Sequence, residues 1–267
     1  MENIDLLPNR IGSAAIGSDG TIWYSAVPGV DGTPKTASLE GEIKSNLFGG
    51  EFKATKPKNG SIFNISSKGV GYTTNYHGTI CGIFSDNRLI FAQYDGNLYE
   101  KSKNGILTQH TPGGPIFHFS VALDDSVWVT RNENGANVYR TTGGANDYEP
   151  MLGAAWLLAP KNADEFWSVR KNAKNDIWGS LWHYNKGNTV EINNVRPISA
   201  AVNSEGRLWI LDDFGGKRRI LELEETPDKW NVIAPKTVNG RILIPIDGNS
   251  ALVINDDNSH KVYNRQH

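Results

Sequence analysis

The stretch that decides the fold is Ala14-Ala15-Ile16-Gly17-Ser18-Asp19-Gly20-Thr21-Ile22-Trp23-Tyr24. It joins small or apolar residues, a polar turn and an apolar-aromatic segment. The same pattern returns as Ala201-Val202-Asn203-Ser204-Glu205-Gly206-Arg207-Leu208-Trp209-Ile210. Glycine preceded by an acidic residue favours a tight turn, and β-branched and aromatic residues favour strands on either side of it. Each copy therefore predicts two antiparallel strands joined by a short turn.

The pattern recurs along the whole chain. The position held by Trp23 is matched at Phe63, Ile90, Trp128, Trp167, Trp209 and Val253. Successive spacings are 40, 27, 38, 39, 42 and 44 residues. A period near 40 with strand-turn-strand units is typical of propeller blades, whereas a solenoid favours a shorter and stricter period. Third and fourth strand-like segments follow most copies, which completes the four antiparallel strands of a blade.

We therefore predict an all-β fold, a single β-propeller domain over residues 1–267 with seven blades of mostly four strands. The alternative is six blades with residues 45–80 as an inserted elaboration. The last unit stops after its third strand, while the segment Asn3-Ile4-Asp5-Leu6-Leu7 precedes the first unit without a partner. If this segment pairs with the last unit, the N-terminal strand closes the ring and protects a sheet edge.

Composition excludes several classes of protein. The chain has 28 glycines, 27 asparagines and 26 aromatic residues, with a net charge of only -2. Abundant aromatic residues argue against disorder, and the charge argues against nucleic-acid binding through bulk electrostatics. A single cysteine, Cys81, excludes an internal disulfide framework. We find neither a signal-peptide pattern nor an apolar run of membrane-spanning length, so we expect synthesis in the cytosol and no membrane insertion.

The segment Gly17-Ser18-Asp19-Gly20-Thr21-Ile22-Trp23-Tyr24 resembles the repeat of the virginiamycin B lyase and sensor-propeller group. The tryptophan-bearing repeats are also similar to those of propeller lectins. The resemblance covers most of the chain at the level of blade pattern and implies a fold. The lyase family uses a histidine, a glutamate and magnesium beside the channel, and no pair of positions here matches that set. The resemblance therefore implies no activity.

Ligand contacts are predicted on the face that carries the loops between second and third strands, because those loops are longer and more varied. Four tryptophans, namely Trp156, Trp178, Trp182 and Trp230, fall outside the repeat register. Aromatic side chains stack on sugar rings and anchor protein interfaces. The predicted ligand-binding residues are Trp178, Trp182, Trp230, Tyr148, Phe214, Asp212, Asp213 and His118.

No catalytic, metal-binding or cofactor-binding motif is present in the sequence. The six histidines form no metal-ligand spacing, and the Asp-Asp pairs sit where turns use aspartate to satisfy backbone donors. His118 belongs to the segment Ile116-Phe117-His118-Phe119-Ser120, an expected innermost strand, so it is predicted to line the central channel. We therefore predict neither a metal nor a cofactor.

Three functions remain open. The first is a non-enzymatic binding or assembly module, such as a phage-tail or capsid-associated virion protein that binds a glycan or neighbouring protein subunits, a further copy of the chain included. The second is a channel-site lyase or hydrolase that uses His118. The third is an intracellular scaffold for protein interactions.

Overall fold

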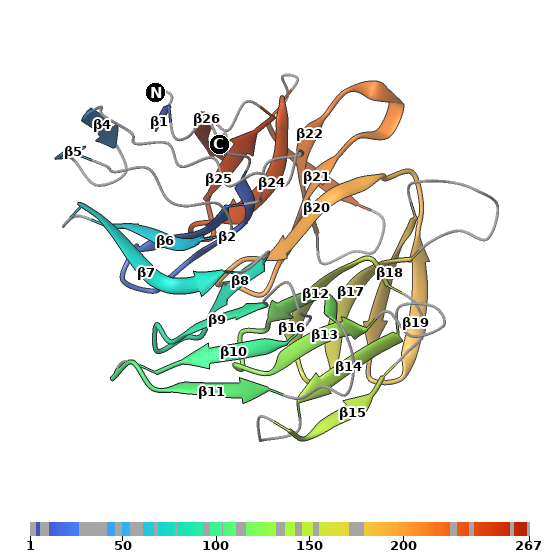
Figure 1. Ribbon diagram of the computed structural model, residues 1–267. Coiled ribbons are helices and arrows are strands. Elements are labelled where there is room, and N and C mark those ends of the chain that lie inside the picture. The colour runs from blue at the N-terminus through green and yellow to red at the C-terminus, as the bar shows by residue number, and fades with distance from the viewer. Residues whose placement is uncertain are drawn as a thin grey trace, which may run out of the picture.

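The fold is a ring of four-stranded antiparallel sheets (Figure 1). The computed structural model describes residues 4–5, 11–26, 42–45, 50–53, 61–66, 69–77, 80–92, 97–102, 104–110, 116–131, 137–141, 146–151, 155–170, 179–224, 229–234, 238–256 and 259–265. Within these residues there are six four-stranded sheets and one two-stranded ribbon. No helix in these ranges is long and apolar enough to cross a membrane.

Each sheet is numbered here by its place along the chain. Sheet 1 contains β2 (Ile11–Ile16), β3 (Ile22–Ala26), β6 (Ser61–Ser66) and β7 (Gly69–His77). Sheet 2 contains β8 (Ile80–Ile83), β9 (Leu89–Ala92), β10 (Leu98–Lys101) and β11 (Leu107–His110). Sheet 3 contains β12 (Ile116–Val121), β13 (Val127–Arg131), β14 (Asn137–Thr141) and β15 (Tyr148–Pro150).

The second half of the ring repeats this arrangement. Sheet 4 contains β16 (Leu157–Asn162), β17 (Glu165–Arg170), β18 (Ser180–Asn185) and β19 (Asn188–Ile192). Sheet 5 contains β20 (Pro197–Val202), β21 (Leu208–Asp212), β22 (Arg219–Leu223) and β23 (Trp230–Ala234), with a short 3-10 helix at Phe214–Gly216. Sheet 6 contains β24 (Gly240–Pro245), β25 (Ser250–Asn255), β26 (Ser259–Asn264) and β1 (Ile4–Asp5).

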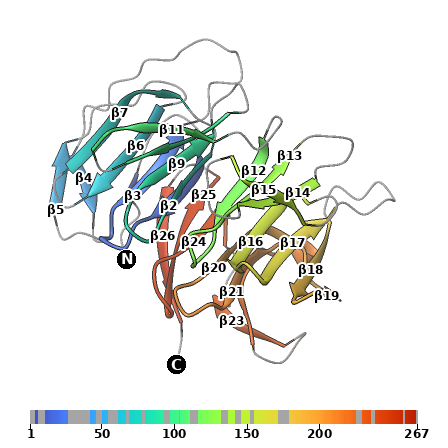
Figure 2. The same cartoon turned by 90° about the horizontal axis from the view of Figure 1, so that it is seen from below.

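The first strands of the sheets surround the centre of the ring. Each first strand contacts the first strand of the next sheet, in the order β2, β8, β12, β16, β20 and β24. β24 also contacts β2, so the series closes on itself (Figure 2). β1 pairs with β26, placing Ile4 opposite His260 and Asp5 opposite Ser259. The predicted all-β propeller and the predicted closure by an N-terminal strand are therefore confirmed.

The predicted count of seven units is wrong for the described residues. Trp23 and Phe63, interpreted as one position in two units, lie on the paired strands β3 and β6 of the same sheet, where Phe63 is opposite Tyr24. The alternative insertion at residues 45–80 also needs correction, because β6 and β7 are the third and fourth strands of sheet 1. The chain between β3 and β6 carries the ribbon of β4 (Glu42–Ser45) and β5 (Gly50–Lys53).

The recurring tryptophans pack one sheet against the next, as the repeat predicted. Trp128 and Trp209 are completely buried. Trp128 lies on Phe166 of sheet 4 with ring centroids 4.5 Å apart. Trp209 belongs to an apolar cluster with Leu243 of sheet 6. A buried aromatic side chain removes roughly 150–250 Å² from water, so this position holds neighbouring sheets together.

Candidate functional site

A groove of about 850 Å³ opens at the ends of sheets 4 and 5 where their short hairpins lie. This volume is within the range of small-ligand sites. The lining comes from both sheets and consists of Lys161, Glu165, Trp167, His183, Val190, Ile192, Glu205, Gly206, Arg207, Leu208, Glu222, Leu223, Glu224 and Asn231. The two sheets meet closely here, because a Cβ atom on Gly206 would lie 2.8 Å from Cε of Lys161.

Sheet 4 contributes an aromatic pair whose imidazole is held by a polar contact. Trp167 and His183 are opposite each other on β17 and β18. Their rings stack with centroids 4.7 Å apart and planes 6° apart. Nε2 of His183 lies 3.1 Å from Oε1 of Glu165, and Nζ of Lys161 lies 2.8 Å from the other carboxylate oxygen. The aromatic pair is therefore held in one orientation before any ligand arrives.

Sheet 5 contributes a buried carboxylate and an exposed guanidinium. Glu222 is completely buried and accepts a hydrogen bond of 3.1 Å from Nε1 of Trp209. Its other carboxylate oxygen accepts a hydrogen bond from Arg265, next to the end of β26. Arg207 lies 3.6 Å from Glu205 and 3.6 Å from Glu222, beyond ordinary hydrogen-bonding distance. The guanidinium is thus attracted by two carboxylates without being hydrogen-bonded to either.

The local chain explains where Arg207 lies. It follows the turn between β20 and β21, in which Gly206 adopts the left-handed conformation with φ of 78°. Oδ1 of Asn203 accepts hydrogen bonds from the backbone N–H groups of Glu205 and Arg207, at 3.1 and 2.8 Å. A glycine that accepts positive φ and an asparagine that satisfies the turn donors are the usual requirements of such a hairpin.

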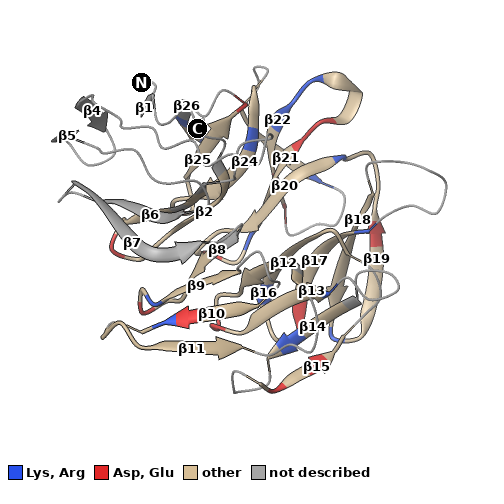
Figure 3. Ribbon diagram, in the orientation of Figure 1, with Lys and Arg blue, Asp and Glu red and all other residues tan. Residues whose placement is uncertain are grey.

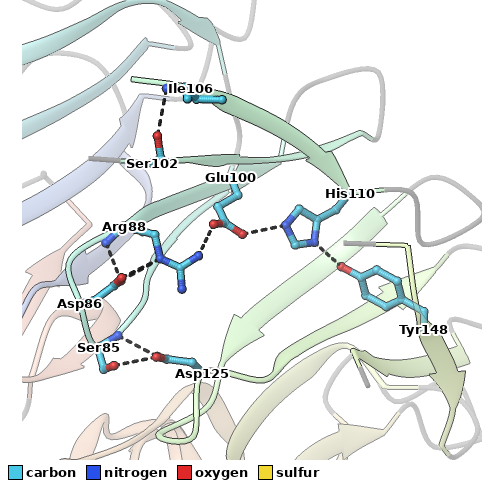
Figure 4. Close-up of polar contacts among 9 residues, drawn as sticks. All are labelled: Ser85, Asp86, Arg88, Glu100, Ser102, Ile106, His110, Asp125 and Tyr148. Carbon is cyan, nitrogen blue, oxygen red and sulfur yellow. Dashed lines mark hydrogen bonds and ion pairs between the residues drawn. The ribbon is translucent and has the colours of Figure 1, made fainter. Parts of the chain in front are cut away.

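A closed copy of the same arrangement exists in sheet 2 (Figure 4). Arg88 occupies the position of Arg207, and it donates hydrogen bonds to Asp86 in its own turn and to Glu100 on β10. Glu100 in turn lies 3.1 Å from Nε2 of His110, and Nδ1 of His110 lies 3.0 Å from the hydroxyl of Tyr148. Here the protein itself supplies these partners, so the network joins sheets 2 and 3.

Burial sets the protonation of the closed network. Burial lowers the pKa of His110, against the opposing effect of Glu100. Burial also raises the pKa of the Tyr148 hydroxyl, and the charge of Glu100 acts in the same direction. Neutral imidazole and protonated phenol are the forms that these hydrogen bonds need near neutral pH.

The groove in sheets 4 and 5 has hydrogen-bonding capacity left over. Arg207 makes no side-chain hydrogen bond to any described residue, while 42% of its side chain is exposed. The indole N–H of Trp167 is buried and has no acceptor among the described residues. An unpaired buried donor costs free energy, but this nitrogen is enclosed by the protein, so the donor open to a ligand is Arg207. Over the same ranges no three histidine, cysteine or acidic residues are grouped to hold a metal ion.

The predicted site residues are distributed over the ring. Trp178 lies outside the described residues. Asp212 is completely buried and accepts hydrogen bonds from the backbone of Arg196 and from Arg219. Tyr148 is bound to His110 as described above. These roles for Asp212 and Tyr148 are structural contacts rather than contacts available to a ligand.

The other predicted residues have more varied surroundings. Phe214 is 50% exposed on its 3-10 helix. Asp213 lies 4.0 Å from Nε of Arg218. Trp182 lies under the guanidinium of Arg170, at 4.8 Å from the ring centroid. Trp230 is opposite Leu223, which lines the groove, but Trp230 itself is not part of the lining.

His118 lines the central channel, a separate cavity of about 460 Å³. Burial lowers the pKa of its imidazole to about 4. Ala14 and Ala201 also line this channel, as expected for residues of the innermost strands. Among the described residues that line the channel there is no carboxylate, so nothing there pairs with His118 as a second acid or base.

Sequence reasoning missed Glu165, His183, Arg207 and Glu222. Glu205-Gly206 predicts only a turn. The predicted binding face carries the loops between second and third strands, whereas the groove lies at the opposite face, beside the hairpins between first and second strands. The expected face stays a prediction, because most of its long loops lie outside the described residues. One signal was available: acidic-x-Arg occurs at the same repeat position in residues 86–88 and 205–207, followed in both units by a glutamate on the third strand.

No protein-family model matches the sequence, and no curated protein matches it either. Solved structures do match. The chain is similar to virginiamycin B lyase from Staphylococcus aureus, with 13% identity, a TM-score of 0.56, and coverage of 100% of this chain and 88% of that one. It is also similar to the calcium-binding protein regucalcin from Agrobacterium tumefaciens, with 13% identity, a TM-score of 0.60, and coverage of 100% and 95%. The tricorn protease gives a TM-score of 0.63 at 14% identity, over 97% of this chain and 25% of that one.

These identities are low, so the likeness concerns the fold. The predicted resemblance to virginiamycin B lyase-like propellers is confirmed at that level. The neighbours include a lyase, a calcium-binding protein and a protease, and so they point to no common chemistry.

Proposed function

We propose that the protein is a non-enzymatic β-propeller binding module and that the groove of sheets 4 and 5 is its ligand site. The observation that carries the proposal is the difference between two copies of one arrangement. In sheet 2 the arginine donates to Asp86 and Glu100, and each oxygen of Glu100 has a partner within the protein. In sheet 5 the equivalent Arg207 lines a groove and is left without a hydrogen bond to a described residue.

The test compares the two arginines. Biotinylated protein displayed on streptavidin would be probed against printed oligosaccharides and synthetic peptides, since multivalent display strengthens weak binding. We expect binding to members of one array that Arg207→Ala abolishes and that Arg88→Ala preserves. Both variants should keep the circular dichroism of the parent chain. Binding that survives Arg207→Ala, or no binding to either array, would overturn the proposal.

The biological setting of the module is a separate matter. A role in a virion, as a phage-tail or capsid-associated protein that contacts other subunits, stays a prediction from composition. The same holds for an intracellular scaffold. Locating the protein by mass spectrometry in purified particles or in host-cell extract distinguishes them.

The channel-site enzyme is the weaker proposal. It is supported by the position of His118 in the channel and by the fold likeness to a lyase. The imidazole is hydrogen-bonded to the backbone of Leu158. The described lining holds no carboxylate or second imidazole beside it, and its other polar side chains are those of Ser13, Ser120, Ser199 and Arg241. A hydrolase or lyase mechanism needs a second group to stabilise developing charge or to transfer a proton.

A further inference from the structure

The groove has a composition that restricts its ligand. Its charged groups are Lys161, Arg207 and four glutamates, and one of these glutamates is also paired with Arg265. Two cations therefore line the groove with four carboxylates, one of which Arg265 compensates from outside the lining, and both signs lie within a few ångströms of each other. Positively and negatively charged residues are likewise interspersed along the described strands (Figure 3). A strongly anionic ligand would meet the carboxylates, and a strongly cationic one would meet Arg207 and Lys161.

The unused hydrogen-bonding groups restrict the ligand further. Arg207 offers N–H donors that need oxygen acceptors. Glu205 and Glu224 offer acceptors that need donors, and Glu205 is 49% exposed. A ligand that fits must therefore present acceptors and donors side by side while carrying no charge. Hydroxyl groups do both, because each has one O–H donor and two lone pairs.

The arrangement of these groups favours neighbouring hydroxyls. A guanidinium presents its N–H groups in a planar fork, which suits two oxygen atoms at a time. Glu205 lies 3.6 Å from the guanidinium and is 49% exposed, so it can accept a hydroxyl proton, whereas Glu222 is buried and both of its oxygens are already hydrogen-bonded. Apolar surface from Val190, Ile192 and Leu208 and the stacked Trp167 and His183 rings completes the lining.

From these observations we infer that the groove binds a neutral carbohydrate, with Arg207 and Glu205 holding adjacent hydroxyls beside the stacked rings of Trp167 and His183. This inference rests on the proposed function and names the ligand class of the same site. A peptide also carries donors and acceptors, but its N–H and C=O groups lie along a backbone and do not form a vicinal pair.

The experiment uses the full chain. Biotinylated wild-type protein on streptavidin is applied to neutral oligosaccharides, acidic oligosaccharides and peptides, and soluble hits are titrated by calorimetry. We expect a neutral oligosaccharide to bind, with a dissociation constant at least about tenfold larger in Arg207→Ala and unchanged in Arg88→Ala; loss of one good hydrogen-bonding group accounts for a factor of that order.

A second measurement reports on the groove directly. In protein labelled with ¹⁵N at the indole nitrogens, the Trp167 signal is assigned with Trp167→Phe, which keeps an aromatic ring and removes the N–H. The Trp167 signal should shift on adding the oligosaccharide, whereas that of Trp128, which packs sheet 3 on sheet 4, should stay in place.

The outcomes separate the two proposals. Arg207-dependent binding of peptides without any carbohydrate would overturn the ligand class and leave the binding module intact. Arg207-dependent binding of acidic oligosaccharides only would overturn the requirement for a neutral ligand. Carbohydrate binding that is indifferent to Arg207→Ala, with no shift of the Trp167 indole, would overturn both the ligand site and the inference.

Discussion

Acidification should destabilise the protein through His118. The pKa of this imidazole is about 4 in the folded chain, because the burial of the ring beside the channel disfavours its charged form, against an ordinary value of 6.5. A lowered folded pKa means that the unfolded chain takes up a proton first as the pH falls. Stability is therefore unaffected well above pH 6.5 and decreases from about that pH down to about pH 4.

The magnitude follows from the two values. At pH 5 the unfolded imidazole is almost entirely protonated and the folded one is mostly neutral, so the linkage relation gives a loss of about 2 kcal/mol between pH 7 and pH 5. His118 keeps some contact with the channel, which makes this figure an upper estimate. The lowered pKa of His110 acts in the same direction.

The assay is urea unfolding at a series of pH values, followed by tryptophan fluorescence. The parent chain should lose free energy of unfolding between pH 7 and pH 5, and His118→Gln should lose about 2 kcal/mol less over the same interval. Ser120→Ala, two residues along the same strand and also beside the channel, changes packing without removing a titrating group and should keep the parent's slope. Equal slopes for His118→Gln and the parent would refute the reasoning.

Other substitutions test the packing and the closed network. Trp128→Ala should lower the free energy of unfolding by roughly 3–5 kcal/mol, because the side chain is completely buried, while Phe214→Ala, which is half exposed, should change it by less than about 0.5 kcal/mol in the same urea titration. Tyr148→Phe removes the hydroxyl beside Nδ1 of His110 and should cost about 1 kcal/mol, measured by thermal unfolding. Asp212→Ala leaves the backbone N–H of Arg196 and the Arg219 guanidinium without their acceptor and should lower the free energy of unfolding by roughly 3 kcal/mol. Asp213→Ala, which removes only a contact of 4.0 Å to Arg218, should lower it by less.

The blade pattern was predictable because it depends on local chemistry. Hairpin turns need glycine, asparagine or aspartate, and a packing position between sheets needs a large apolar residue, so both leave a periodic trace in the sequence. The number of units was harder to predict. Phe63 follows Asn59-Gly60 just as Trp23 follows Asp19-Gly20, yet it belongs to the third strand of the first sheet. Two local signs pointed to that difference: the unusually short spacing from Phe63 to Ile90, and the five residues between Thr74 and Ile80, which are too few for a further strand.

The candidate site was not predictable in the same way. Glu165 and His183, or Arg207 and Glu222, come together through strand pairing across many residues, and a groove forms only when two sheets meet. Tyr148 and Asp212 were predicted to contact a ligand. In the folded chain Tyr148 is hydrogen-bonded to His110 and Asp212 to Arg219. A residue's availability to a ligand depends on which neighbours satisfy it, and those neighbours come from other sheets.

A single pair of positions accounts for much of the difference between the open and closed copies. In sheet 2, His110 is opposite Leu98, and Leu98 comes two residues before Glu100. The imidazole of His110 reaches the carboxylate of Glu100. In sheet 5 the equivalent residue is Ala234. It is opposite Ile220, which comes two residues before Glu222. A methyl group can neither hydrogen-bond the carboxylate nor extend toward a partner on the next sheet.

The replacement of histidine by alanine also changes the contacts of Arg207. Glu222 is instead bound by Trp209 and by Arg265, which hold it in the buried position, and Arg207 is left 3.6 Å away rather than in hydrogen-bonding contact. In sheet 2, by contrast, His110 takes one oxygen of Glu100 and leaves the other to Arg88. The same repeat thus yields an internal brace where the outer strand supplies an imidazole, and a guanidinium open to a ligand where it supplies alanine.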